Sequence, residues 1–226
     1  MRIFRFFRRP HFMWIHRFFL VVVVSLSGAA RAEEASSEDR DTAIFAGGCF
    51  WCMEPPFDKA GGVIATTSGY IGGHGSNPSY KQVSRGDTGH FEAVRVTFRP
   101  SVINYQQLLQ IFWVNIDPFD AKGQFCDTGS PYFSAIFISD EEQRALAEVS
   151  KANLQKSLPS TSDIKTQILD AAEFYAAEDY HQGYYQKNPF RYRFYRHGCG
   201  RDRRLDELWG KSRSLPFDSL VSKNKE

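Results

Sequence analysis

The chain has 226 residues, of which 42% are hydrophobic, 15% aromatic and 24% charged. This composition is that of a folded globular protein, and it excludes a mainly disordered chain or a collagen-like or coiled-coil repeat. The formal net charge of +2 is unevenly spread, because residues 1–32 carry six arginines and no acidic residue. The rest of the chain has 22 basic and 26 acidic residues, so it has no basic excess and we expect no nucleic-acid partner.

The first 32 residues have the pattern of an export signal. Arginines precede an apolar run over 18–27, and the small-residue site Ala30-Arg31-Ala32 follows it. The run is too short to span a bilayer as a helix, which needs about 20 residues. We therefore predict a signal peptide over 1–32 and an exported, periplasmic protein with no stable membrane association. The alternative is an uncleaved anchor that holds the protein to the inner membrane through residues 1–32.

Beyond a polar linker over 33–41, apolar residues recur with the periods of strands and helices. Strands are expected over 42–46, 63–70, 90–98, 132–138 and 164–169, and helices over 49–59, 100–116, 139–158 and 177–186. This order predicts one α/β (α+β) catalytic domain over 42–212, a two-layer sandwich on a split βαβ, ferredoxin-like core. From residue 188 the chain is aromatic, basic and interrupted by glycines, which predicts a long irregular C-terminal segment and a tail over 213–226.

The four cysteines are too few for a disulfide scaffold, and they are Cys49, Cys52, Cys126 and Cys199. One interpretation is a single structural disulfide with two buried thiols. Cys49, however, follows two glycines at the start of a helix, where free N–H groups and the helix dipole favour the nucleophilic thiolate. A zinc site is disfavoured, because there is no second CxxC and the histidines lack the usual ligand spacing.

Three further residues could carry chemistry. Glu92 lies within a predicted apolar strand, on the same face as His90. A carboxyl group there is costly to bury unless it is paired or protonated, so Glu92 is either a buried acid or part of a solvent-facing strand edge. Tyr80 and Tyr132 follow turns, and each is either a packing residue or a polar site group.

Taken together, these motifs resemble the A-type peptide methionine sulfoxide reductases. The resemblance rests on GCFWC at 48–52, GYIGG at 69–73, NPSY at 77–80, GDTGHFEAV at 86–94 and the segment from Asp127 to Tyr132. It runs from about Thr42 to Pro189 with compatible spacing. The stretch over 179–210 resembles the branch that carries GCFWC.

The resemblance implies a site, a reaction and a partner. Cys49 would be the nucleophile and Glu92 the acid. The polar walls of the site would be Tyr80, Asp127 and Tyr132. The pocket for the methyl group of the substrate would be formed by Phe50 and Trp51. The enzyme would reduce methionine S-sulfoxide, free or in oxidised proteins, through a sulfenic acid on Cys49. A thioredoxin-like donor would then reduce the resulting disulfide. No metal or organic cofactor is implied, and we expect a monomer.

The resolving cysteine stays open, because the chain lacks the glycine-rich tail with paired cysteines of some family members. Cys52 is favoured, since it lies one helical turn from Cys49. Cys199 is an alternative that a mobile tail could deliver, and Cys126 is a third candidate. Two other functions remain possible: a thioredoxin-like dithiol oxidoreductase that uses Cys49 and Cys52 alone, and an exported binding module with one structural disulfide.

Overall fold

The computed structural model describes residues 39–159 and 161–213, which belong to a compact unit that begins at Asp39. The predicted signal peptide and nearly all of the tail lie outside the described residues. Within them, no helix combines the length and the apolar character that a membrane crossing requires.

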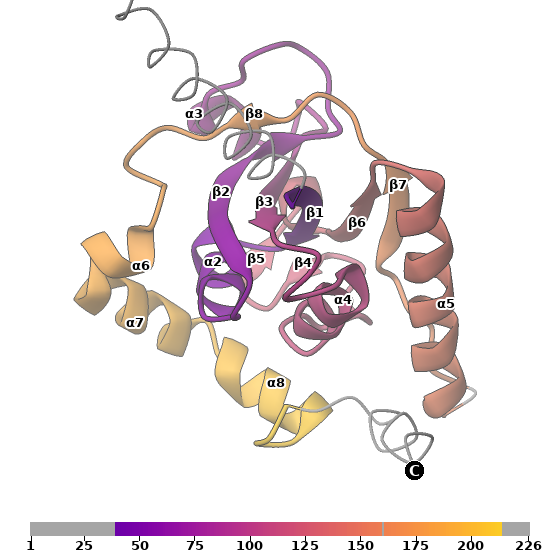
Figure 1. The fold of residues 1–226 in the computed structure, drawn as a ribbon. Helices are drawn as coiled ribbons and strands as arrows, with labels where there is room; N and C mark the ends of the chain where they lie inside the picture. The colour runs from indigo at the N-terminus through magenta and orange to yellow at the C-terminus, as the bar shows by residue number, and fades with distance from the viewer. Residues whose placement is uncertain (1–38, 160, 214–226) are drawn as a thin grey trace, which may run out of the picture. The chain divides into compact units, whose positions relative to one another are not determined.

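The fold is built on a six-stranded sheet with the order β7-β6-β1-β3-β2-β8 (Figure 1). The strands are β1 (Asp41–Gly47), β2 (Val63–Ile71), β3 (Phe91–Phe98), β6 (Ser134–Ile138), β7 (Gln167–Asp170) and β8 (Tyr175–Ala176). Neighbours pair antiparallel except β6 and β7, which are parallel. Strand β3 therefore lies between β1 and β2, which run in the same direction, so the predicted split βαβ core is confirmed. A small hairpin joins β4 (Gly123–Gln124) to β5 (Asp127–Thr128).

Helices connect and follow the strands: α2 (Phe50–Asp58), α3 (Tyr80–Val83), α4 (Tyr105–Trp113), α5 (Glu141–Ser157), α6 (Tyr184–Lys187), α7 (Pro189–Gly198) and α8 (Arg201–Trp209). A 3-10 turn spans Ser130–Tyr132. Helix α4 begins later than its apolar spacing predicts, because the Asn104 side chain accepts the Gln107 N–H and Gln107 bonds back to the Asn104 backbone.

The sheet buries apolar side chains on both faces. Phe45 of β1 stacks on Phe57 of α2 and on Phe112 of α4, each at 5.2 Å between ring centroids. Its neighbours Ile44 and Ala46 point to the opposite face, as alternation along a strand requires. The first face carries the larger core, and this packing fixes α2, which contains Cys52 and follows Cys49, against the sheet.

Two parts of the fold differ from the sequence predictions. The helix expected over 177–186 is confined to α6, and turns precede it. The segment expected to be irregular forms helices α7 and α8, linked at Gly200, whose φ of 70° lies in the left-handed region that favours glycine. Leu205 and Trp209 of α8 are buried, and the Trp209 ring N–H donates to the Ile116 carbonyl at 3.1 Å. The glycines that predicted an irregular segment stand at the ends of these two helices.

Candidate active site

Cys49 lies at the junction between the sheet and α2. Strand β1 ends at Gly47, Gly48 adopts a φ of +77°, and Cys49 caps the helix. A Cβ on residue 48 would lie 2.5 Å from Cβ of Gln124, so both the backbone angle and the close approach require glycine. The Cys52 N–H donates to the Cys49 carbonyl at 3.0 Å, and both thiols are buried, at 6% and 1% exposure for Cys49 and Cys52.

Glu92 faces this junction from β3, the strand next to β1. Its side chain is buried, and Oε2 accepts the Phe50 N–H at 3.1 Å. Burial raises the pKa of Glu92 to about 8, and the Phe50 hydrogen bond opposes that rise. Glu92 is therefore a protonated carboxylic acid at neutral pH and can donate a proton. His90 precedes the strand and contacts the backbone of Gly73 and Gly75 instead.

Three other predicted polar residues surround Cys49 and Glu92. Tyr80 and Tyr132 hydrogen-bond to each other, and burial raises the pKa of Tyr80 to about 12 and that of Tyr132 still higher. Both hydroxyls thus remain proton donors. The Asp127 carboxylate accepts a hydrogen bond from the Tyr195 hydroxyl, and burial raises the pKa of Asp127. The structure therefore brings all five predicted polar residues together.

The two aromatic residues after Cys49 are held by aromatic neighbours. The Trp51 ring stacks on Tyr184 at 3.7 Å, and its N–H donates to Nδ1 of His181 at 2.9 Å. Phe50 is fully buried and packs against His181 and Tyr70. Trp51 is only half-buried, so it is the member of the predicted methyl pocket that a substrate can touch without rearrangement.

The two buried thiols share one hydrogen bond. Burial and the neighbouring Cys52 raise the pKa of Cys49 well above its ordinary value. The Cys49 hydrogen bond lowers the pKa of Cys52 to about 6, and the charges of Arg201 and Arg196 act in the same direction. In this state the pair therefore favours the negative charge on Cys52, and the thiolate on Cys49 stays a prediction.

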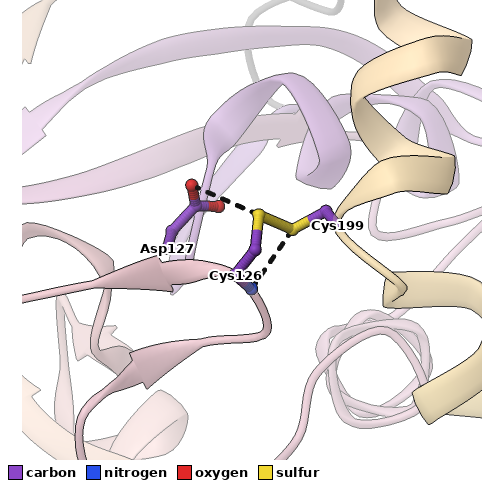
Figure 2. A group of neighbouring side chains, drawn as sticks. All are labelled: Cys126, Asp127 and Cys199. Atoms are coloured by element: carbon purple, nitrogen blue, oxygen red, sulfur yellow. Dashed lines mark hydrogen bonds between the residues drawn. A yellow bond between two sulfur atoms is a disulfide. The ribbon is translucent and has the colours of Figure 1, made fainter.

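The remaining cysteines form a disulfide between Cys126 and Cys199 (Figure 2). Their Cα atoms are 4.9 Å apart, and the bond joins the turn between β4 and β5 to the end of α7. The Cys126 N–H donates to Sγ of Cys199 at 3.2 Å, and Sγ of Cys126 lies 3.8 Å from Oδ1 of Asp127. Cys199 and Cys126, the alternative resolving cysteines, are thus bonded to each other, while Cys52 is free.

Sequence reasoning missed three residues of the site. The Tyr195 hydroxyl contacts Cys49 as well as Asp127, His181 holds Trp51, and Arg201 lies beside the thiol pair. All three come from the part of the chain after residue 176. The aromatic and basic composition of that segment was the available signal, but it does not tell which side chains turn inward.

Comparison with known proteins agrees with this geometry. The family model described as "Peptide methionine sulfoxide reductase" matches residues 41–213. A "Peptide methionine sulfoxide reductase MsrA" from Bacillus subtilis is 51% identical over 174 residues, which cover 77% of this chain and 98% of that protein. The "Peptide methionine sulfoxide reductase MsrA 2" of Caulobacter vibrioides is 47% identical over 181 residues, covering 80% and 91%.

Solved structures are similar as well. The reduced form of Mxr1 from Saccharomyces cerevisiae matches with a TM-score of 0.64 and 30% identity, over 68% of this chain and 88% of that one. The methionine sulfoxide reductase A of Corynebacterium diphtheriae matches with a TM-score of 0.60 and 32% identity, over 67% and 76%. The similarity in sequence spans almost the whole of the bacterial relatives, and the family model covers the residues that meet at Cys49. The chain belongs to the peptide methionine sulfoxide reductase family.

Proposed function

We propose that this family member reduces methionine S-sulfoxide with Cys49 as nucleophile and Glu92 as proton donor, and so repairs oxidised proteins. Family membership carries the enzyme class, an oxidoreductase acting on methionine sulfoxide. The residue roles rest on one observation: the buried Cys49 lies among an acid that stays protonated and two tyrosines that keep their protons. A dithiol oxidoreductase or a binding module would have no use for that acid.

The chemistry follows from the substrate. Attack of the Cys49 sulfur on the sulfoxide sulfur places negative charge on the sulfoxide oxygen. Glu92 donates a proton to that oxygen, and Tyr80 and Tyr132 support it by hydrogen bonds, as in an oxyanion hole. Methionine leaves, and Cys49 remains as a sulfenic acid. Every group required is supplied by the protein or the substrate.

The thiol pair can deliver the nucleophile. Because the Cys49 S–H donates to the Cys52 thiolate, moving one proton along this bond places the negative charge on Cys49. Cys52 then acts as the base for Cys49. The charge of the pair is unchanged, so the transfer avoids creating a second buried anion.

The activity is expected to be restricted to one epimer, because each reductase type handles one sulfoxide configuration. Separate S and R epimers of a methionine sulfoxide peptide are incubated with the protein and dithiothreitol, and methionine is quantified. We expect turnover of the S epimer alone and none with Cys49→Ser. Equal turnover of both epimers, or of neither, contradicts the proposed function.

Cys52 is proposed as the resolving cysteine. Cys199 and Cys126 are already joined, whereas the Cys52 thiol is hydrogen-bonded to Cys49. After one turnover without reductant, the protein with its disulfide intact should lose two thiols per methionine formed. Cys52→Ser should lose only one and retain a sulfenic acid on Cys49. The Cys126→Ala/Cys199→Ala double variant should still lose two; if it stops at the sulfenic acid instead, Cys199 or Cys126 resolves the intermediate.

An exported location and a thioredoxin-like reductant complete the proposal. Disulfides persist in oxidising compartments, so the exposed Cys126 within a disulfide supports export through residues 1–32. A dithiol protein would reduce the Cys49–Cys52 disulfide by exchange, and we propose that the enzyme acts as a monomer free of the membrane. Release of a protein that begins at Glu33 on osmotic shock would support export, whereas intact residues 1–32 in the membrane pellet would favour the anchor.

A further inference from the structure

Among the described residues, Arg201 is a buried cation with no acidic side chain within salt-bridge distance. It opens helix α8 with an exposure of 1%. Its Nη2 donates to the carbonyls of Gly47 and Asn115 at 3.0 and 2.7 Å and contacts Sδ of Met53 at 2.9 Å. Its guanidinium carbon lies 4.4 Å from the ring centroid of Phe125. All of these partners are neutral, and Nε has no hydrogen-bond partner.

A buried charge needs compensation, because desolvation penalises an isolated ion. Across the part of the chain that the structure describes, no carboxylate lies within salt-bridge distance of Arg201. Asp127 interacts electrostatically with Arg201 from beyond salt-bridge distance, and Glu92 is protonated. A further anion near Arg201 would therefore add to the compensation that Asp127 gives.

The thiol pair is in the right place to supply it. Gly47 precedes Cys49 by two residues and Met53 follows Cys52 directly, so the guanidinium contacts both ends of the segment that carries the thiols. Cys52 is faced by titratable or charged groups on four sides: Cys49 at the N-cap of α2, Glu92 of β3, Tyr192 and Arg196 of α7, and Arg201 of α8. The groups that face Cys49 are Glu92, Asp127, Tyr80, Tyr132 and Tyr195.

Arg196, the other cation near Cys52, already has its counter-ion. Its Nε and Nη2 bind both carboxylate oxygens of Asp202 at 2.9 and 2.6 Å. Asp202 also binds Nη2 of Arg213 at 2.6 Å, and Arg196 hydrogen-bonds to Cys52 as well. Both cations lower the pKa of Cys52, and of the two only Arg201 has no carboxylate within salt-bridge distance in residues 39–159 and 161–213.

We propose that Arg201 is the counter-ion of the thiolate that Cys49 and Cys52 share, and that this positioning residue keeps Cys52 ready to close the disulfide. In that step Cys52 gives up the proton that it took from Cys49, and its thiolate attacks the sulfur of the Cys49 sulfenic acid. The S–S bond forms, the S–O bond breaks, and the leaving hydroxide takes up that proton to become water. Cys52 is oxidised and Cys49 is reduced, so no outside oxidant is needed. The role of the thiolate in disulfide closure rests on the proposed function, whereas the pairing of its charge with Arg201 does not.

The test is a pH titration of the thiolate by its ultraviolet absorbance, which needs neither substrate nor access to the buried sulfur. Wild type is compared with Arg201→Met, with Arg201→Lys, which keeps the charge, and with Arg203→Met, which removes an exposed arginine from the same helix. Wild type and Arg203→Met should titrate near pH 6. Arg201→Met should raise the midpoint by about 1–3 pH units, and Arg201→Lys should recover part of the difference.

A second readout separates this role from a structural one. In Arg201→Met, closure of the Cys49–Cys52 disulfide below pH 7 should slow about tenfold or more and recover as pH rises, whereas misfolding would slow it at every pH. An unchanged midpoint in Arg201→Met overturns the proposal. If that variant does not fold, the wild-type titration decides. A wild-type thiol that titrates only at the ordinary cysteine pKa of about 8.5 overturns the proposal equally. Normal titration without reductase activity would instead contradict the proposed function.

Discussion

Glu92→Gln is expected to slow the reduction of methionine sulfoxide by about 10²–10⁴-fold, the usual effect of removing a general acid. Glutamine keeps a hydrogen-bond donor at the place where the sulfoxide oxygen would lie, but it has no proton to transfer. Substrate binding should therefore change little, and the loss should appear in the chemical step. The burial of Glu92 and its raised pKa give the physical reason.

Single-turnover methionine formation measures this effect without the recycling steps. Because Glu92 must be protonated and its pKa is about 8, the wild-type rate should fall as pH rises through that value. The falling limb should be absent in Glu92→Gln. Glu141→Gln is the matched control, since the Glu141 side chain is 94% exposed and far from any role in the site. A Glu92→Gln rate within a factor of about two of wild type would show that this acid does not donate the proton.

Loss of the Cys126–Cys199 disulfide is expected to lower the free energy of unfolding by about 2–5 kcal/mol. The bond closes a loop across a sequence separation of 73 residues, and a cross-link of that span restricts the unfolded chain strongly. It also fastens α7, which carries Tyr195, to the hairpin that carries Asp127. The Cys126→Ala/Cys199→Ala variant should therefore unfold at lower urea concentration than wild type.

Reductant provides the control for that measurement. Dithiothreitol should lower the unfolding midpoint of wild type toward that of the double variant, and it should leave the double variant unchanged. A wild-type midpoint that is the same with and without reductant would show that the disulfide contributes nothing to stability.

The parts of the site that sequence could predict are local or carry a specific motif. The turn at Gly47 and Gly48 follows from two glycines between a strand and a helix, and Glu92 is conspicuous as a carboxyl group within an apolar strand. These residues meet because β3 pairs with β1, as the split βαβ arrangement requires. For these residues the sequence motif and the strand pairing both predict that Glu92 lies beside Cys49.

The C-terminal contribution could not be predicted in the same way. Arg201 donates to a carbonyl 154 residues earlier, and Tyr195 to a carboxylate 68 residues earlier. Helical periodicity does not encode such distant partners, and a basic segment normally indicates a solvated surface. The cysteine pairing was equally open, since four cysteines allow three ways of forming two disulfides. The charge of the thiol pair depends on these same distant cations, which the local pattern around Cys49 does not show.

The distance along the chain between Cys52 and Arg201 also sets when the thiol becomes reactive during biosynthesis. The N-terminal part of a protein leaves the ribosome first, so Cys49 and Cys52 emerge long before α8 exists. Until Arg201 docks against Gly47, Cys52 lacks this cation, and its ordinary pKa keeps it mostly protonated at neutral pH. A protonated thiol is a poor nucleophile, so the growing chain carries its redox centre in a protected form. Completion of α8 then activates the thiols, which ties chemical reactivity to the finished fold.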